Sequence, residues 1–230
     1  MVGVTQSFDL EKTSVRELNQ FLHHELASVG QVNIASPNGQ HSIAAGVDAD
    51  VKIDIQGHAG YFIAGMNKQA QVTIHGNVGW SVAENMMSGT VRVCGHASQS
   101  AGASAHGGLL VVEGDASSRC GISLKGGNIV VQGSVGHFSG FMAQAGNLVI
   151  CGDGGANLGD SLYEAKIYVL GNVASLGADA QQEDLQQEDI DCLTDLLGQA
   201  DIDQKAEHFK KIASAKTLYH WNPQAGAGVV

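Results

Sequence analysis

Short runs in which apolar and polar residues alternate return along the chain at every nineteenth position. Each run has apolar side chains at two positions separated by one residue, and all of them except Leu110 and Leu148 are β-branched, the type that favours strands. The pairs are Ile53/Ile55, Val72/Ile74, Val91/Val93, Leu110/Val112, Ile129/Val131, Leu148/Ile150 and Ile167/Val169. This alternation predicts one strand in each repeat.

A glycine follows each apolar pair by two positions and keeps the same period without insertion or deletion. These anchor glycines are Gly57, Gly76, Gly95, Gly114, Gly133, Gly152 and Gly171. Further columns of small residues lie three, seven and thirteen positions after each anchor, beginning at Gly60, Ala64 and Ala70. Because only glycine occupies the anchor column, we predict a positive φ there; in the other columns, where Ala and Ser also occur, we predict a limit on side-chain volume.

A repeat of this length, with one strand and several small-residue corners, is typical of one coil of a parallel β-helix. We therefore predict an all-β fold, a single-stranded right-handed parallel β-helix of about eight coils over residues 32–180, although the spacing itself does not set the hand. Val32 and Ile34 extend the apolar columns into a first coil, in which Asn38 replaces the anchor glycine. Coils stacked about 4.8 Å apart would give a rod on the order of 40 Å long.

The two ends of such a rod expose unpaired strand edges and apolar core, so the flanking segments are expected to cover them. Residues 1–31 contain the capping-box pattern Ser14 to Glu17 and an apolar stripe, which predicts a helix to about Leu26. Residues 181–230 begin with an acidic run and continue with apolar positions at helical spacing around residues 193–197 and 202–212. We predict a helical, acidic C-terminal tail with two short helices, lying on the rod or on a partner.

Charge and composition exclude several classes of partner. The formal net charge is −11, and residues 179–230 hold 10 acidic but only 4 basic side chains. Without a cluster of Lys and Arg, neither nucleic acid nor an anionic membrane is an expected partner. The chain has no apolar stretch long enough to cross a bilayer and no basic segment followed by an apolar one at its start, so we expect a cytoplasmic protein without a membrane span.

Cysteine and histidine positions do not indicate a catalytic or metal site. Cys94, Cys120, Cys151 and Cys192 form no CxxC pair and have no zinc-like spacing with histidine. His58 and His96 share a column but lie two coils apart, about 10 Å, which is too far for one metal ion. We predict no catalytic residue, cofactor or metal site in this chain, and we interpret the residues that follow the anchors as polar turn residues.

Two stretches place charged or flexible side chains in coils that otherwise carry small residues. The first is Glu84, Asn85, Met86 and Met87, and the second is Arg119 with Lys125. Methionine adapts to varied binding partners, and arginine is enriched at interfaces. These six residues are our predicted subunit interface.

The pattern Gly136 to Gly140 after Gly133 resembles the GXGXG domain, a β-helical domain found at the C-terminus of the glutamate synthase large subunit and as the C subunit of formylmethanofuran dehydrogenase. Residues 58–68, 82–89, 113–121, 134–137 and 141–146 are more specifically similar to the small stand-alone, GlxC-like subunits of N-methylglutamate synthase. Outside the repeat, residues 14–19, 209–212 and 218–221 also fit these subunits.

The resemblance implies a division of labour in a hetero-oligomer. The enzyme to which such subunits belong, N-methylglutamate synthase, converts methylamine and glutamate to N-methylglutamate and releases ammonia. The expected partners are a class II amidotransferase-like subunit and an FMN-binding, glutamate-synthase-like subunit that carries an iron–sulfur cluster. This chain would be a non-catalytic structural subunit that orients them; a place in the wall of an ammonia or methylamine passage is a further hypothesis.

Two alternatives stay open at the level of sequence. The chain could be a subunit of a glutamate synthase or formylmethanofuran dehydrogenase complex, which share the glycine framework. It could instead be a stand-alone left-handed β-helix acyltransferase, because its corners follow one another after seven, six and six positions, close to the hexapeptide rule of those enzymes.

Overall fold

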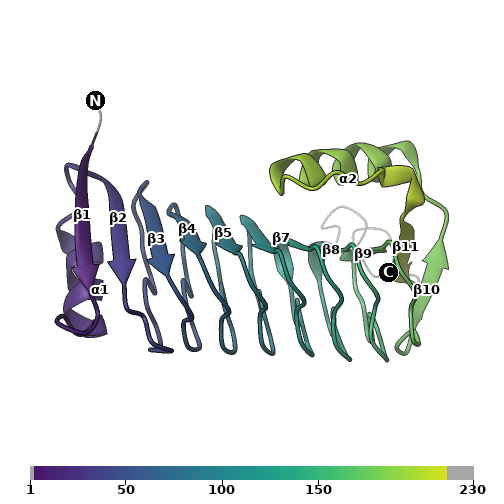
Figure 1. Cartoon of the computed structure of the whole chain (residues 1–230). Helices are drawn as coiled ribbons and strands as arrows, with labels where there is room; N and C mark the ends of the chain where they lie inside the picture. Colours follow the sequence, from purple (N-terminus) through teal and green to yellow (C-terminus); the bar gives the residue numbers. More distant parts are fainter. Residues whose placement is uncertain (1–2, 217–230) are drawn as a thin grey trace, which may run out of the picture.

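Parallel strands, one per coil, lie side by side along a rod, with a helix at one end and a second helix laid along one side (Figure 1). The computed structural model describes residues 3–216. One sheet runs the length of the rod in the order β1-β2-β3-β4-β5-β6-β7-β8-β9-β11-β10. The elements are β1 (Val4–Asp9), α1 (Val15–His24), β2 (Val29–Ala35), β3 (Lys52–Gln56), β4 (Gln71–Ile74), β5 (Thr90–Val93), β6 (Leu109–Val112), β7 (Lys125–Val131), β8 (Ala145–Ile150), β9 (Lys166–Val169), β10 (Ala180–Glu183), α2 (Gln187–Gln199), the 3-10 turn η1 (Ala206–His208) and β11 (Lys210–Ser214).

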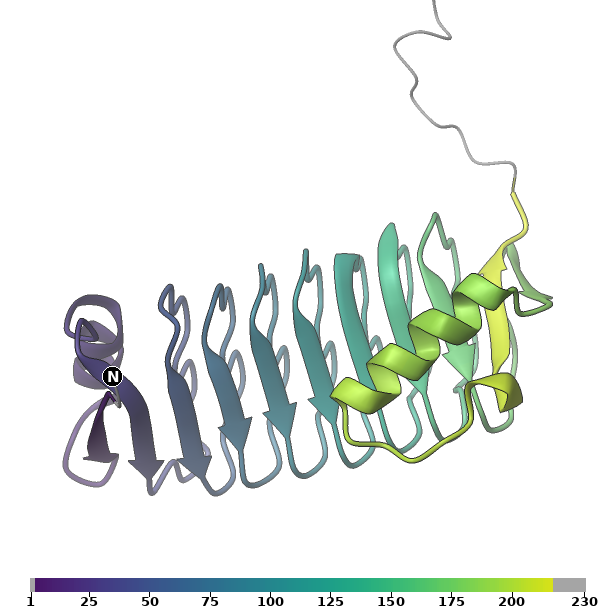
Figure 2. The same cartoon turned by 90° about the horizontal axis from the view of Figure 1, so that it is seen from above.

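The predicted β-helix is confirmed, and its coils are right-handed. In Figure 2 the strands nearest the viewer run downward while the coils advance from left to right, which is the right-handed sense. From β3 to β9 each strand pairs in parallel with the next in the register that the repeat predicts, as Ile53 with Val72 and Val72 with Val91.

The first coil differs from the prediction because it is longer than the others by two residues. Val32 pairs with Ile53, and Ala35 pairs with Gln56. Ser36, and not Asn38, is therefore level with Gly57, and Asn38 belongs to a longer turn. The predicted apolar columns are correct here, but the anchor position is wrong.

The anchor glycines are required for a reason other than the predicted one. Only Gly57 among the seven has a positive φ. At Gly152, a Cβ would lie 2.6 Å from the carbonyl carbon and 2.7 Å from the carbonyl oxygen of Gly133, in the coil below. Stacked backbones approach so closely at this corner that no side chain fits between them.

Positive φ occurs instead in the column seven positions after the anchors, where we predicted a limit on volume. Ala64, Ala83, Gly102, Gly121, Gly140 and Gly159 have φ from 51° to 70°. Each of their N–H groups donates to a carbonyl of the preceding coil, as from Gly102 to Val82 at 2.8 Å. Left-handed backbone costs an alanine about 1 kcal/mol or more, which explains why glycine takes four of these six positions.

The N-terminal end is covered as predicted. The Ser14 hydroxyl accepts from the Glu17 N–H at 3.3 Å, and the Glu17 carboxylate accepts from the Ser14 N–H at 2.9 Å, which completes the capping box of α1. Leu18 and Leu22 are buried against the first coil. The Asn19 side chain donates to the carbonyl of Ser42 and accepts from the N–H of Ala44, so the helix is fixed to the rod.

The C-terminal tail is only partly helical. The first expected helix is α2, but residues 202–212 contain a 3-10 turn and most of strand β11, so the second expected helix is wrong. β11 pairs antiparallel with β9 and places Ile212 opposite Ile167 in the core. The open edge of β9 offers unpaired N–H and C=O groups, and pairing them outweighs the helical spacing of the apolar residues.

α2 lies over the outer face of β6–β9 and buries it (Figures 1 and 2). Outward-facing residues of these strands, Leu109, Val111, Val130, Val149 and Tyr168, pack against Leu193, Leu196, Leu197 and Phe209. The strands of this half are therefore buried on both faces, whereas β3 and β4 turn polar side chains outward.

Charged residues fix both ends of α2. Asp189, in its first turn, is fully buried and accepts hydrogen bonds from Lys166 at 2.9 Å, Tyr168 at 2.8 Å and Lys211 at 3.1 Å. At the other end, Arg92 of β5 donates to the carbonyl of Ala200 at 3.2 Å and pairs with Asp201 at 3.1 Å. A cation at the C-terminus and a carboxylate at the N-terminus both complement the helix dipole.

Replacing an anchor glycine should destabilise the rod. We expect Gly152→Ala to lower the free energy of unfolding by about 2–3 kcal/mol, because the new Cβ collides with the Gly133 carbonyl. A Cβ added at Gly198, in α2, would meet no other part of the structure within 4 Å, so Gly198→Ala should raise stability by about 0.5–1 kcal/mol. Urea unfolding followed by circular dichroism measures both; equal effects of the two substitutions would contradict the stacking explanation.

The Asp189 cluster should make stability depend on acid pH. Burial would raise the pKa of Asp189, but hydrogen bonds from the Gln186 N–H, Lys166, Tyr168 and Lys211 outweigh it and hold the pKa well below its usual range. The stabilisation is therefore complete above the unfolded pKa, about 3.9, and is lost as the pH falls below it.

Asp189→Asn should cost about 3 kcal/mol at pH 7 and reduce the fall in stability between about pH 5 and 3, because it leaves two lysines without their buried partner. Glu188→Gln removes an exposed partner of the same Lys166 and should cost less than about 1 kcal/mol. Denaturant unfolding across this pH range tests both variants. An unchanged pH profile in Asp189→Asn would show that the cluster does not control acid stability.

Candidate functional site

The four cysteines are free thiols without an activating environment. Burial raises the pKa of Cys120 to about 12 and that of Cys151 to about 11. It also raises the pKa of Cys94, with a contribution from Glu113, and the pKa of Cys192. Because the thiolate is the reactive species, these side chains are poor nucleophiles at neutral pH.

The polar residues that follow the anchors form a ladder of hydrogen bonds along the rod. Each side chain accepts from the backbone N–H of the equivalent residue in the next coil, at distances between 2.7 and 2.9 Å. The accepting side chains are His58, Asn77, His96, Asp115, Ser134 and Asp153, and the ladder ends at the N–H of Asn172. The two histidines accept through Nδ1, which requires the tautomer with the proton on Nε2. These residues are turn residues, as predicted, and they also connect the coils.

No group of three His, Cys, Asp or Glu side chains within residues 3–216 is arranged to hold a metal ion. In the same part of the chain, no helix has the length and apolar character needed to cross a bilayer.

The structure separates the six predicted interface residues. Met86 is fully buried in the rod core and cannot offer its side chain to a partner, so it is wrongly included. Glu84 and Asn85 are half-buried, and Met87 is exposed. Arg119 and Lys125 are also exposed. They lie two coils further along the rod, about 10 Å away along its axis.

Sequence reasoning missed the aromatic residues beside Glu84. Tyr61 and Trp80 occupy the same column in adjacent coils and are 51% and 59% exposed. The His41 ring stacks on Tyr61 with a centroid distance of 3.5 Å. A groove of about 600 Å³ is lined by Ser42, Tyr61, Phe62, Trp80, Ser81 and Glu84. We call it the aromatic groove.

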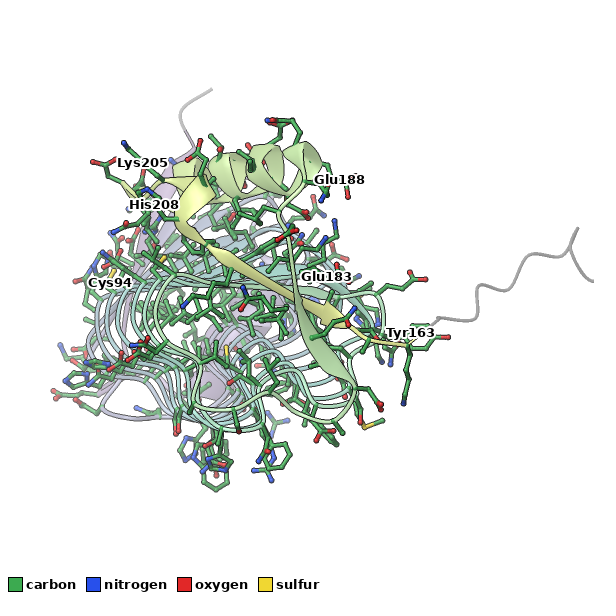
Figure 3. All side chains as sticks on the ribbon, turned by 90° about the vertical axis from the view of Figure 1, so that its right-hand side faces the viewer. Cys94, Tyr163, Glu183, Glu188, Lys205 and His208 are labelled. Carbon is green, nitrogen blue, oxygen red and sulfur yellow. The ribbon has the colours of Figure 1, made fainter. Side chains whose placement is uncertain are left out.

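A second exposed apolar group lies nearer the C-terminal end. Met142 and Tyr163 are 50% and 44% exposed and line a groove of about 380 Å³ with Gln144 and Ser161. Figure 3, a view along the rod, shows Tyr163 on a different side from α2, which carries Glu188. Exposed apolar side chains thus gather on the sides of the rod that α2 leaves uncovered.

The column arrangement could have identified the aromatic groove. The positions of Tyr61 and Trp80 are taken by Gln99 and Ser118 in the next two coils. Large aromatic rings at a position where the fold accepts polar residues are not explained by core packing. Such a departure from the repeat is a signal of a binding surface.

Two comparisons with known proteins agree with each other. The family described as the GXGXG motif matches residues 31–227. Protein GlxC of Rhizobium meliloti (strain 1021) is 50% identical over 217 residues, which cover 93% of this chain and 95% of that protein.

The ladder can be tested at His96, whose Nδ1 accepts from the N–H of Asp115 at 2.9 Å. His96→Leu removes the acceptor and should lower the free energy of unfolding by about 1 kcal/mol. His96→Asn supplies the same kind of acceptor that Asn77 provides one coil earlier, and it should stay within about 0.3 kcal/mol of the original chain. Urea unfolding of both variants is the measurement, and equal losses would contradict a role for the side-chain acceptor.

Proposed function

The chain belongs to the GXGXG family, and on that premise we propose that it is a non-catalytic assembly subunit of a multi-subunit, glutamate-synthase-like enzyme. In this role the rod holds catalytic subunits in a fixed relative orientation. The observation that carries the proposal is the set of exposed apolar side chains, Tyr61, Met66, Trp80, Met87, Met142 and Tyr163, on a rod whose core is already complete. Exposed apolar groups of this kind mark surfaces that contact other proteins.

The architecture suits a rigid spacer. Successive coils are joined by parallel strand pairing and by the side-chain ladder. Separate elements cover the two ends, α1 at one and the β10–β11 pair at the other. A body with these connections cannot bend at a linker, so partners bound at different coils keep a constant separation.

The most specific form of the proposal is N-methylglutamate synthase. This enzyme combines methylamine with glutamate, giving N-methylglutamate and ammonia. The partners would be a class II amidotransferase-like subunit and an FMN-binding subunit with an iron–sulfur cluster, and both cofactors would belong to the partner. The support is the residue-level resemblance, because two of its segments, residues 58–68 and 82–89, contribute Tyr61, Phe62 and Glu84 to the aromatic groove.

The alternatives are not equally supported. Complexes of the glutamate synthase or formylmethanofuran dehydrogenase type share the glycine framework, and they differ from the proposed complex in their other subunits. The stand-alone acyltransferase is disfavoured, because that class has left-handed coils built on three hexapeptides, whereas these coils are right-handed and each is one residue longer than three hexapeptides (Figure 2).

Purification of the native complex tests the proposal. We expect the chain to co-purify in fixed ratio with an amidotransferase-like subunit and a flavin-containing subunit, identified by mass spectrometry and by the flavin absorbance. Methylamine and glutamate should be converted by the complex and not by the isolated chain. Recovery of the chain as a solitary protein that turns over an acyl-CoA would overturn the assignment, and a molybdenum or tungsten dehydrogenase partner would replace the enzyme named here.

A further inference from the structure

The geometry points to the aromatic groove as the docking site for an arginine side chain of a partner subunit, with the guanidinium between the aromatic rings and the carboxylate of Glu84. This inference rests on the proposed assembly role and adds to it the location and the chemistry of one contact.

The Glu84 carboxylate has no partner of its own in the described part of the chain. It makes no hydrogen bond or ion pair with any residue from 3 to 216, and no basic side chain lines the groove. Lys68, the lysine closest to Met66 in sequence, is already paired with Asp48 at 2.5 Å. The groove therefore combines apolar walls with one uncompensated negative charge.

The equivalent acid at the second apolar group is engaged. Asp160 occupies the same column as Glu84 four coils further along the rod. It accepts hydrogen bonds from the Ser161 hydroxyl at 2.8 Å and from the Ala178 N–H at 3.3 Å. Of the two exposed apolar groups, only the aromatic groove thus combines aromatic rings with a carboxylate at this position that has no partner among residues 3–216.

The negative charge of Glu84 determines which kind of partner side chain can bind in the aromatic groove. A partner that covers the groove removes Glu84 from water, and an unpaired buried carboxylate costs several kcal/mol. The partner must therefore supply a positive group. Arginine fits better than lysine because its planar guanidinium stacks on aromatic faces and also donates two parallel hydrogen bonds to a carboxylate.

The backbone adds an independent indication. Phe62 and Met66 have φ of 60° and 56°, the left-handed region that bulky side chains avoid. In the next two coils serine or asparagine takes these positions, at Ser81, Ser100, Asn85 and Ser104. The same residue types return only four coils further on, at Phe138 and Met142 of the second apolar group. Large apolar side chains at these left-handed positions are therefore not required by every coil, which agrees with a role in binding for both apolar groups.

The test measures binding of the full-length chain to the FMN-binding subunit recovered from the native complex. We expect Trp80→Ala to weaken binding roughly 30-fold, as for a central aromatic contact. Glu84→Lys should weaken it on the order of 100-fold through like-charge repulsion. Glu84→Gln should weaken it roughly 10-fold and reduce its dependence on salt concentration.

Matched controls separate docking from stability. Met66, which is exposed and has a left-handed backbone, lies close to the groove in the coil of Tyr61. Met66→Ala should weaken binding several-fold. Glu207→Gln, an exposed acid beside α2, should have no effect. Circular dichroism and thermal unfolding of each variant verify that the rod is intact.

The outcomes distinguish the two proposals. If the original chain binds the subunit and Trp80→Ala and Glu84→Lys bind within about twofold of it, the docking inference is overturned and the assembly role stands. Tighter binding by Glu84→Lys would also overturn it, as would an effect of Trp80→Ala on self-association alone. If the original chain does not bind the FMN-binding subunit, the proposed function fails and the docking inference fails with it.

Discussion

The close approach of backbone to backbone between successive coils is the constraint on which the whole structure depends. At the corner that contains Gly133 and Gly152, a Cβ would have to occupy the space of a carbonyl group in the coil below. From Gly76 onward, each coil can therefore follow the last only if its corner position has no side chain. The strand ladder, the polar ladder and the continuous apolar core all require this separation to be the same at every level.

The repeat makes much of the fold predictable. Period, strand positions and the capping box at Ser14 follow from local patterns that are independent of the rest of the chain. The roles predicted for the two glycine columns are reversed in the structure, because a column of glycine can reflect either a left-handed backbone or a close contact, and spacing cannot separate them. Ala64 and Ala83 show that left-handed positions accept a Cβ when a hydrogen bond to the preceding coil compensates.

The long-range contacts are harder to predict from the sequence. Ile202 to Ile212 has the spacing of a helix, but the decisive factor is the free edge of β9, which lies far away in sequence. One signal is present: Leu109 to Val112 is continuously apolar where the earlier strands alternate, which indicates burial on both faces. The aromatic groove similarly depends on which columns face solvent, so its residues form a recognisable site only when exposure is known.

The helix α2 has a length that matches the sheet beneath it. Its 13 residues span about 20 Å, and the four strand spacings from Arg92 on β5 to Lys166 on β9 also amount to about 19 Å. The length of the helix therefore fixes the number of coils between β5 and β9. An extra coil inserted between β6 and β9 would move Lys166 out of reach of Asp189 while Arg92 held the other end, whereas a coil added before β5 would leave the helix undisturbed. Growth or shrinkage of the rod by whole coils is thus confined to its N-terminal half, and this is the half that carries the aromatic groove.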